Sequence, residues 1–255
     1  MNRSVWLGAA LPLVLLVGWE ASLRLSGLVT DSLAPPSAVV ASFGSAVSEG
    51  TLFKDTGNTL AALALGLLLG AGPGMIVGIA LGLVPALANV ARAPVEVLRT
   101  LPSVALIPLS LIAFGFGYSM EIAIVAFATF WPTLVLSQAA VAGVDKLLLE
   151  VANVLKLGPV QRVLKIVLPA AAPRLIIAVR LAIGVALIVA VTVEIVANPQ
   201  GLGYALVIAQ QSLNPARMLA YLLWVGLLGW GLNWLLVRFE RKVAHHGRPP
   251  GGPKS

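Results

Sequence analysis

The intervals between charged residues constrain this fold more than any other feature of the sequence. Sixteen uncharged residues follow Arg3, 36 follow Asp55, 21 follow Arg99, 23 follow Glu121 and 20 follow Arg217, and residues 175–197 contain only two charges. A helix rises about 1.5 Å per residue, so roughly 20 apolar residues cross a hydrocarbon core about 30 Å thick. We therefore predict six membrane-spanning helices, at about 5–25, 58–84, 99–117, 121–143, 174–197 and 217–238.

Composition supports a fold in lipid rather than in water. Only 11% of the 255 residues are charged, whereas about 25% is usual for a soluble domain. The predicted fold class is an all-α polytopic membrane protein, with one transmembrane domain over residues 1–240 and a disordered basic tail over 241–255. The chain has no cysteine, which excludes disulfides, thiolate metal sites and cysteine nucleophiles. A net charge of +7 at this low charge density does not indicate nucleic-acid binding.

The distribution of basic residues predicts the orientation in the membrane. If both termini lie in the cytoplasm, most of the 17 Lys and Arg residues fall on the cytoplasmic side, as the positive-inside rule requires. The first span is short enough to be the apolar core of a secretory signal instead. Glu20 and Arg24 follow it, where the cleavage region of a signal would be small and neutral. An uncleaved first helix is therefore the favoured interpretation.

The second predicted span carries five glycines at a spacing of four residues. They are Gly66, Gly70, Gly74, Gly78 and Gly82. Four residues overshoot one helical turn by about 40°, so these glycines form a groove without side chains that winds slowly round the helix. In lipid, small residues let two helices approach closely. We favour packing within the chain, with a subunit interface as the alternative.

The loop between the fourth and fifth spans, residues 144–169, is patterned as two short helices. Gly158 suits the left-handed position that ends a helix, and Pro159 suits the first turn of the next. The first of these helices has one apolar and one polar face. The polarity alone fits either a helix that docks on a protein or one that rests on lipid headgroups.

Residues of this loop resemble a known signature. Glu150-Val-Ala152, followed by Ile166-Val-Leu168-Pro169, resembles the "EAA" loop of ABC importer permeases, although Lys156 stands where the family has glycine. The resemblance extends through Trp19-Glu20, Ala34-Pro-Pro-Ser-Ala38, Arg99 to Pro108, Phe114-Gly-Phe-Gly117, Glu194 and Gly201-Leu-Gly-Tyr204. In order and spacing these segments resemble the nitrate, sulfonate and taurine type of binding-protein-dependent permease.

The resemblance implies a type I importer permease in the bacterial cytoplasmic (inner) membrane, and a coupling helix in the loop. Its partners would be a second permease copy, two cytoplasmic ATPase subunits and an extracytoplasmic substrate-binding protein. The coupling role falls on Glu150, Ala152, Asn153, Lys156, Leu157 and Gly158. The solute would be an oxyanion, a sulfonate or a similar organic anion. We expect no cofactor in this chain, with ATP and magnesium held by the ATPase subunits, because the sequence has no Gly-x-x-x-x-Gly-Lys-Ser/Thr loop.

Polar residues inside the predicted spans are candidates for a pathway or gate, because burying them in lipid is costly. They are Ser137, Gln138, Arg180, Thr192 and Glu194. Arg180 could instead reach the cytoplasmic headgroups. We expect Glu194 either to gate the pathway or to form a hydrogen bond between helices. The remaining three side chains could equally form hydrogen bonds to a neighbouring helix.

Three other function classes compete with an ABC permease. An ion-coupled secondary transporter commonly has carboxylates or broken helices at mid-bilayer, often in two inverted repeats. Glu194 is the only acidic residue that we predict inside a span, and the sequence shows no convincing repeat. A membrane scaffold subunit would transport nothing. An intramembrane enzyme would need a nucleophile or a metal set, and the sequence has no His-Glu-x-x-His motif. We therefore expect no catalytic site in this chain.

Overall fold

The computed structural model describes the backbone of residues 3–26 and 33–245, and the side chains of residues 11–26 and 33–238 apart from Leu13. The regular elements of this part of the chain are all helices, which confirms the predicted all-α class. The predicted disordered tail, 241–255, lies largely outside the described residues.

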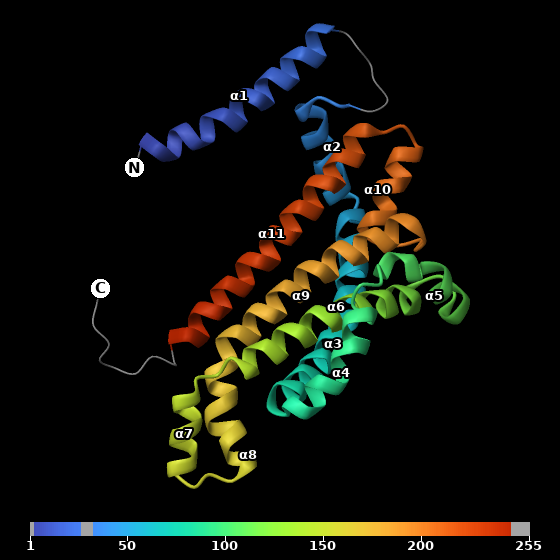
Figure 1. Ribbon diagram of the computed structural model, residues 1–255. Coiled ribbons are helices and arrows are strands. Elements are labelled where there is room, and N and C mark those ends of the chain that lie inside the picture. The colour runs from blue at the N-terminus through green and yellow to red at the C-terminus, as the bar shows by residue number, and fades with distance from the viewer. Residues whose placement is uncertain (1–2, 27–32, 246–255) are drawn as a thin grey trace.

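Thirteen helical elements follow one another in the described ranges (Figure 1). They are α1 (Arg3–Ser26), α2 (Pro36–Ser48), α3 (Thr51–Leu83), α4 (Pro85–Leu98), the 3-10 helix η1 (Ser103–Leu106), α5 (Ile107–Phe114), α6 (Tyr118–Ala142), α7 (Lys146–Val154), α8 (Pro159–Arg162), the π-helix η2 (Val163–Val167), α9 (Leu168–Val196), α10 (Gly201–Gln211) and α11 (Pro215–His245).

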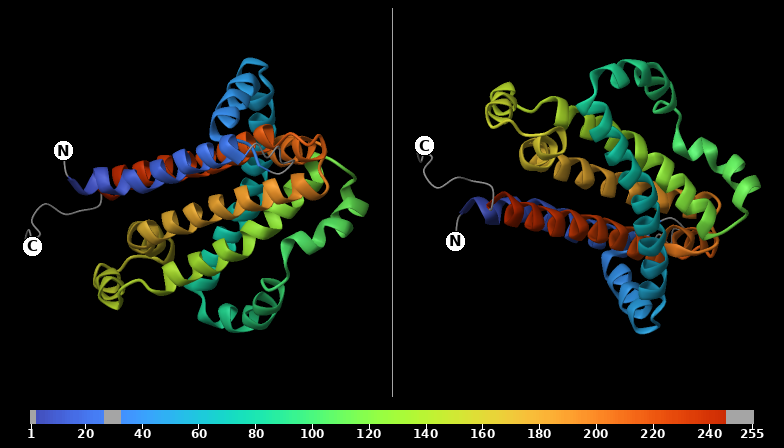
Figure 2. Two further views of the ribbon diagram at one scale, coloured as in Figure 1. Left: turned by 90° about the horizontal axis from the view of Figure 1, so that it is seen from above. Right: turned by 90° about the horizontal axis from the view of Figure 1, so that it is seen from below.

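The centre of the molecule is the bundle of α3, α6 and α9, with α11 packed along α9 (Figures 1 and 2). Leu63 of α3, Ile124 of α6 and Ala190 of α9 belong to one buried apolar cluster where the three helices meet. A second cluster joins α2, α10 and α11 to the start of α3, around the buried Tyr221. Among the described elements, α1 contacts mainly α2 and stands apart from the bundle.

The glycine stripe of α3 lies against α6. A Cβ atom at Gly66 would stand 2.6 Å from the Val125 Cβ, and one at Gly74 would stand 2.5 Å from the Phe130 carbonyl oxygen. Neither approach is possible for a real side chain, so these positions need glycine. The partner numbers rise along α6 as the glycine numbers rise along α3, so the two helices run in the same direction.

Four of the described helices are long and apolar enough to cross a membrane. They are Thr51–Leu83, Tyr118–Ala142, Pro159–Val196 and Pro215–Arg238. They overlap the predicted spans 58–84, 121–143, 174–197 and 217–238. The predicted span 5–25 lies within α1, whose side chains are described only from residue 11.

The structure differs from the prediction at 99–117, where no single helix forms. Residues 99–102 interrupt the helical structure between α4 and η1. Residues Pro85–Leu98 and Ser103–Phe114 are together long and apolar enough for one span, but the two segments are bent by 76° relative to each other. The cause is Pro102, because proline has no backbone donor and its ring disfavours a helical conformation in the preceding residue, and Pro102 itself is extended, with a ψ of 117°. The bent pair returns the chain to the start of α6 (Figure 1).

Candidate coupling and pathway sites

The loop 144–169, called the elbow below, projects from one end of the bundle as two short helices (Figure 1). The Asp145 side chain accepts a hydrogen bond from the Leu147 N–H at 2.9 Å and so caps the start of α7. Ala152 is fully buried on the side of α7 that packs against η2, while Glu150 and Asn153 are exposed. A larger side chain at Ala152 would therefore separate α7 from the base of α9.

The turn after α7 is a Schellman motif. The Lys156 N–H donates to the Asn153 carbonyl at 3.0 Å, and the Leu157 N–H donates to the Ala152 carbonyl at 3.1 Å. The left-handed residue is Lys156, with a φ of 49°. The prediction that Gly158 takes this conformation is wrong, because its φ is −63°. Lys156 therefore takes the left-handed conformation itself, at the conformational cost that a side chain brings there.

The second half of the elbow leads directly into α9. Residues Val163–Val167 form a π-helical turn, and Pro169 and Pro173 lie in the first two turns of α9. Arg174 donates from Nη1 to the Gly143 carbonyl at 2.9 Å, which fixes the start of α9 to the end of α6. The elbow is therefore anchored to the bundle on both sides.

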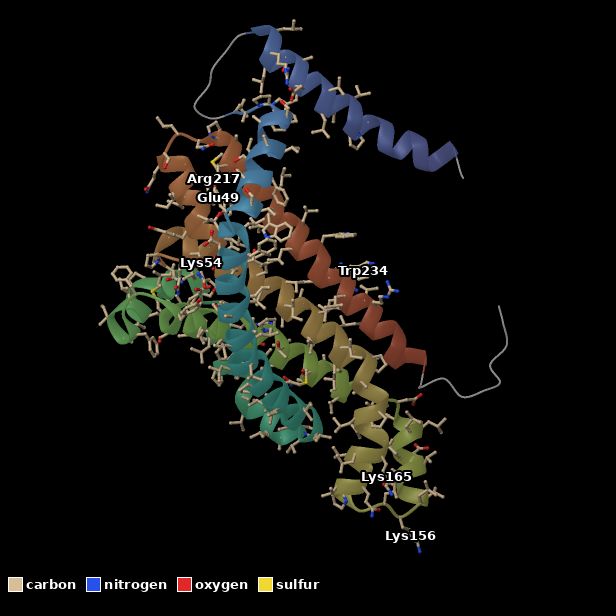
Figure 3. The ribbon with its side chains drawn as sticks, turned by 180° about the vertical axis from the view of Figure 1, so that it is seen from behind. Glu49, Lys54, Lys156, Lys165, Arg217 and Trp234 are labelled. Atoms are coloured by element: carbon tan, nitrogen blue, oxygen red, sulfur yellow. The ribbon has the colours of Figure 1, made fainter. Side chains whose placement is uncertain are left out.

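The outer surface of the elbow is apolar as well as charged. Val154 is 81% exposed. Four other apolar side chains of α7 and its C-cap are also exposed, namely Leu147, Leu148, Val151 and Leu155. Lys156 and Lys165 lie near the tip (Figure 3). Exposed apolar side chains gathered on one short element indicate a docking surface.

At the other end of α9, Glu194 is 1% exposed and joins three helices. Its carboxylate accepts hydrogen bonds from the Thr59 hydroxyl at 2.7 Å and from the Gly203 N–H at 2.8 Å. The Thr59 oxygen in turn accepts from the Leu202 N–H at 3.0 Å. Both N–H groups belong to the first turn of α10, where backbone donors lack partners in the helix and a carboxylate is favoured. Glu194 thus links α9 to α3 and α10.

Gly201 and Gly203 make this arrangement possible. Gly201 has a φ of 89°, and a Cβ atom at Gly203 would stand 2.8 Å from the Glu194 Cβ. This contact gives a physical reason for the Gly201-Leu-Gly-Tyr204 segment.

Glu121 is a buried acidic residue that the sequence analysis missed. It lies in the first turn of α6, fully buried beside Glu194, and its Oε2 accepts a hydrogen bond from the Asn198 side chain. The prediction that Glu194 alone is acidic within a span is therefore wrong. Counting charges placed Glu121 at the end of a predicted span, and such a count does not show whether the side chain at that end is buried or exposed.

The remaining pathway candidates are not brought together. Ser137 is fully buried against Gly78 of α3, and its hydroxyl has no hydrogen-bond partner. Thr192 donates to the Ile188 carbonyl of its own helix at 2.7 Å. Arg180 donates from Nε to the Asn233 side chain of α11 at 2.8 Å. Gln138 lines a cavity between α4 and α6.

The sequence matches a model of the family described as "Binding-protein-dependent transport system inner membrane component" over residues 70–245. An aliphatic sulfonates transport permease protein, SsuC, of Bacillus subtilis (strain 168) is 30% identical over 95% of this chain and 88% of its own. The taurine transport system permease protein TauC of Escherichia coli (strain K12) is 26% identical over 95% and 90%. The nitrate import permease protein NrtB of Leptolyngbya laminosa is 31% identical over 76% and 69%.

The fold matches that of a solved transporter. A chain of the MetNI methionine ABC transporter, in an inward-facing conformation, superposes with a TM-score of 0.66 at 21% identity, covering 73% of this chain and 93% of that one. The permease-like fold expected from the sequence is confirmed. The chain belongs to the family of binding-protein-dependent transport system inner membrane components, and it is the membrane permease of an ABC importer.

Proposed function

We propose that this permease carries a small organic or inorganic anion, a sulfonate or a comparable oxyanion, into the cytoplasm. The support for the solute class is that three relatives are named for aliphatic sulfonates, taurine and nitrate. The direction and the orientation follow the distribution of Lys and Arg, which puts both termini and the elbow in the cytoplasm.

The observation that carries the coupling proposal is the construction of the elbow. A short helix with a fully buried Ala152 and an exposed apolar surface projects from the bundle and continues through η2 into α9. In the proposal an ATPase subunit holds Glu150, Asn153 and the exposed valines, and it pulls on α9 through a joint that Arg174 stiffens. Leu157 and Gly158 set the angle between the two elbow helices.

The assembly contains a second permease copy, two ATPase subunits that hold ATP and magnesium, and a substrate-binding protein on the face formed by α2 and α10. This chain contributes no catalytic residue. Its own part is to open and close the pathway when the elbow moves.

Uptake and ATP hydrolysis by the reconstituted complex test the coupling. Glu150→Lys reverses a charge on the exposed face of α7, and Ala152→Leu forces α7 away from η2. We expect each variant to lose most ATP-driven uptake of ethanesulfonate while the permease still inserts into the membrane. Ser22→Ala, an exposed change on α1, which stands apart from the bundle, is the control and is expected to transport normally. Wild-type uptake by both elbow variants would refute the coupling role.

A further inference from the structure

Helix α4 turns its charged face toward the bundle and its apolar face outward. Asn89, Arg92, Glu96 and Arg99 follow at helical spacing and share one side of the helix. The opposite side is strongly exposed, with Val90 at 77% and Val97 at 64%, and the charged side is also open to solvent, with the Arg92 and Glu96 side chains 77% and 54% exposed. In a membrane protein, charged side chains face the bundle interior or a water-filled cavity, and they mark the route of an ion or solute.

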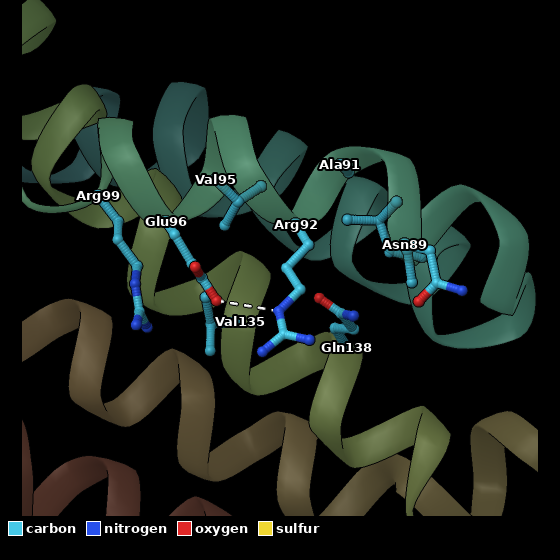
Figure 4. Close-up of a pocket in the computed structure, with 10 residues that line it drawn as sticks. Asn89, Ala91, Arg92, Val95, Glu96, Arg99, Val135 and Gln138 are labelled. Atoms are coloured by element: carbon cyan, nitrogen blue, oxygen red, sulfur yellow. Dashed lines mark hydrogen bonds and ion pairs between the residues drawn. The ribbon is translucent and has the colours of Figure 1, made fainter.

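The charged face of α4 lines a cavity of about 260 Å³ between α4 and α6 (Figure 4). Arg92, Glu96 and Arg99 reach into it from α4 and its C-cap, and Gln138 faces them from α6. Apolar side chains, among them Val135, form the rest of the wall. The cavity thus offers polar donors on one side and apolar contact on the other.

The charges in the cavity favour an anion. The Arg92 Nε donates to the Glu96 carboxylate at 3.2 Å, which orients the guanidinium and leaves its terminal nitrogens unused by that ion pair. No described acidic residue pairs with Arg99. Two guanidinium groups against one carboxylate leave a net positive charge, and the amides of Gln138 and Asn89 add further donors.

We propose that this cavity is an anion-binding station on the translocation pathway, which holds the sulfonate or similar oxyanion head of the solute. The terminal nitrogens of Arg92 and the guanidinium of Arg99 donate to the oxygens, because a guanidinium fork matches the spacing of two oxygens of an oxyanion. Val95 and Val135 contact the small apolar part of an organosulfonate. Glu96 holds Arg92 in position. This inference rests on the anion class given in the proposed function and assigns the residues that recognise it.

The absence of native cysteine allows the cavity to be probed directly. In the assembled complex, Val95→Cys places a thiol on the cavity wall, and its modification by a sulfonate-bearing and by a trimethylammonium-bearing methanethiosulfonate is followed by mass spectrometry. We expect the ratio of the anionic to the cationic rate to be higher at this position than at the control Val90→Cys, and ethanesulfonate to slow the modification more than choline does. Adding Arg99→Gln is expected to change each rate about threefold in opposite directions, the effect of one unit charge several ångströms away in water.

Val90→Cys, on the opposite face of α4 and about 13 Å from Arg99 by helical rise, is the matched control, and its rates are expected to be insensitive to Arg99→Gln. The inference is overturned if ethanesulfonate gives no protection at Val95→Cys, or if Arg99→Gln leaves the ratio of the two rates unchanged.

Uptake separates this inference from the proposed function. Arg99→Gln is expected to lower ethanesulfonate uptake about tenfold, the equivalent of one lost charge-assisted hydrogen bond, while Lys54→Gln, an exposed cation at the other end of α3, leaves it unchanged. If the wild-type complex imports ethanesulfonate and Arg99→Gln does so equally well, the station is refuted and the proposed function stands. If the wild type imports neither sulfonate nor nitrate while ethanesulfonate still protects Val95→Cys, the solute assignment fails and the anion site stands.

Discussion

Replacing Gly70 by alanine is expected to push α3 and α6 apart. A methyl group at this position would stand 2.6 Å from the Ala126 Cα, whereas carbon atoms in contact prefer about 3.5–4.0 Å. The obstacle is backbone rather than a flexible side chain, so rotation of a side chain cannot relieve it. The helices must therefore separate by about 1 Å at this point, which forfeits part of the dispersion energy along the whole stripe.

Gly72, on the same helix, provides the control, because its Cβ atom would point away from α6. Nothing lies within 4 Å of the position that a Cβ atom would take at Gly72, and alanine there gains up to about 1 kcal/mol in helix propensity. Overpacking at Gly70 costs typically about 1–3 kcal/mol. The two variants should therefore differ by about 3 kcal/mol in the free energy of unfolding.

Thermal unfolding of the purified protein in detergent measures this difference. For a chain of this size about 1 kcal/mol corresponds to about 2–4 °C, so Gly70→Ala should unfold at least about 5 °C below Gly72→Ala. Equal midpoints for the two variants would refute the close packing of α3 on α6 derived from the glycine stripe.

Two further predictions concern single hydrogen-bonded sites. Glu194→Ala removes the acceptor for the Thr59 hydroxyl and the Gly203 N–H, and each unpaired buried donor costs about 1–3 kcal/mol. The midpoint of thermal unfolding should therefore fall clearly below that of Thr192→Ala, a control whose hydrogen-bond partner lies in its own helix. Equal midpoints for the two variants would contradict the linking role of Glu194. Lys156→Gly removes the cost of a side chain at a φ of 49°, about 1–2 kcal/mol. The variant should make the elbow more resistant to proteolysis and keep coupled uptake. Gly158→Ala, at an ordinary φ, should change the rate of proteolysis little. Faster cleavage of Lys156→Gly would show that the lysine side chain itself stabilises the turn.

The long apolar helices and the elbow could be predicted from the sequence, because both follow from patterns along the chain. Intervals with few or no charges located α3, α6, α9 and α11, since a span needs little beyond length and apolarity. The break at Pro102 was not predicted, because counting charges does not detect where a helix turns by 76°. The left-handed residue at Lys156 was missed for a related reason. Glycine is the residue expected in a left-handed conformation, whereas the hydrogen bonds of the turn determine which position adopts that conformation.

The glycine stripe was visible in the sequence, whereas an equivalent stripe on α9 was not. Ala178, Ala182, Ala186 and Ala190 also repeat every four residues, and each is at most 1% exposed. Alanine is common in helices for its propensity alone, so its spacing carries little signal until the neighbours are known. Ala186 and Ala190 lie in one cluster with side chains of α6. Small residues on α3 and α9 therefore hold α6 closely from two sides, and the face of α6 that carries Gln138 is left to line the cavity with α4.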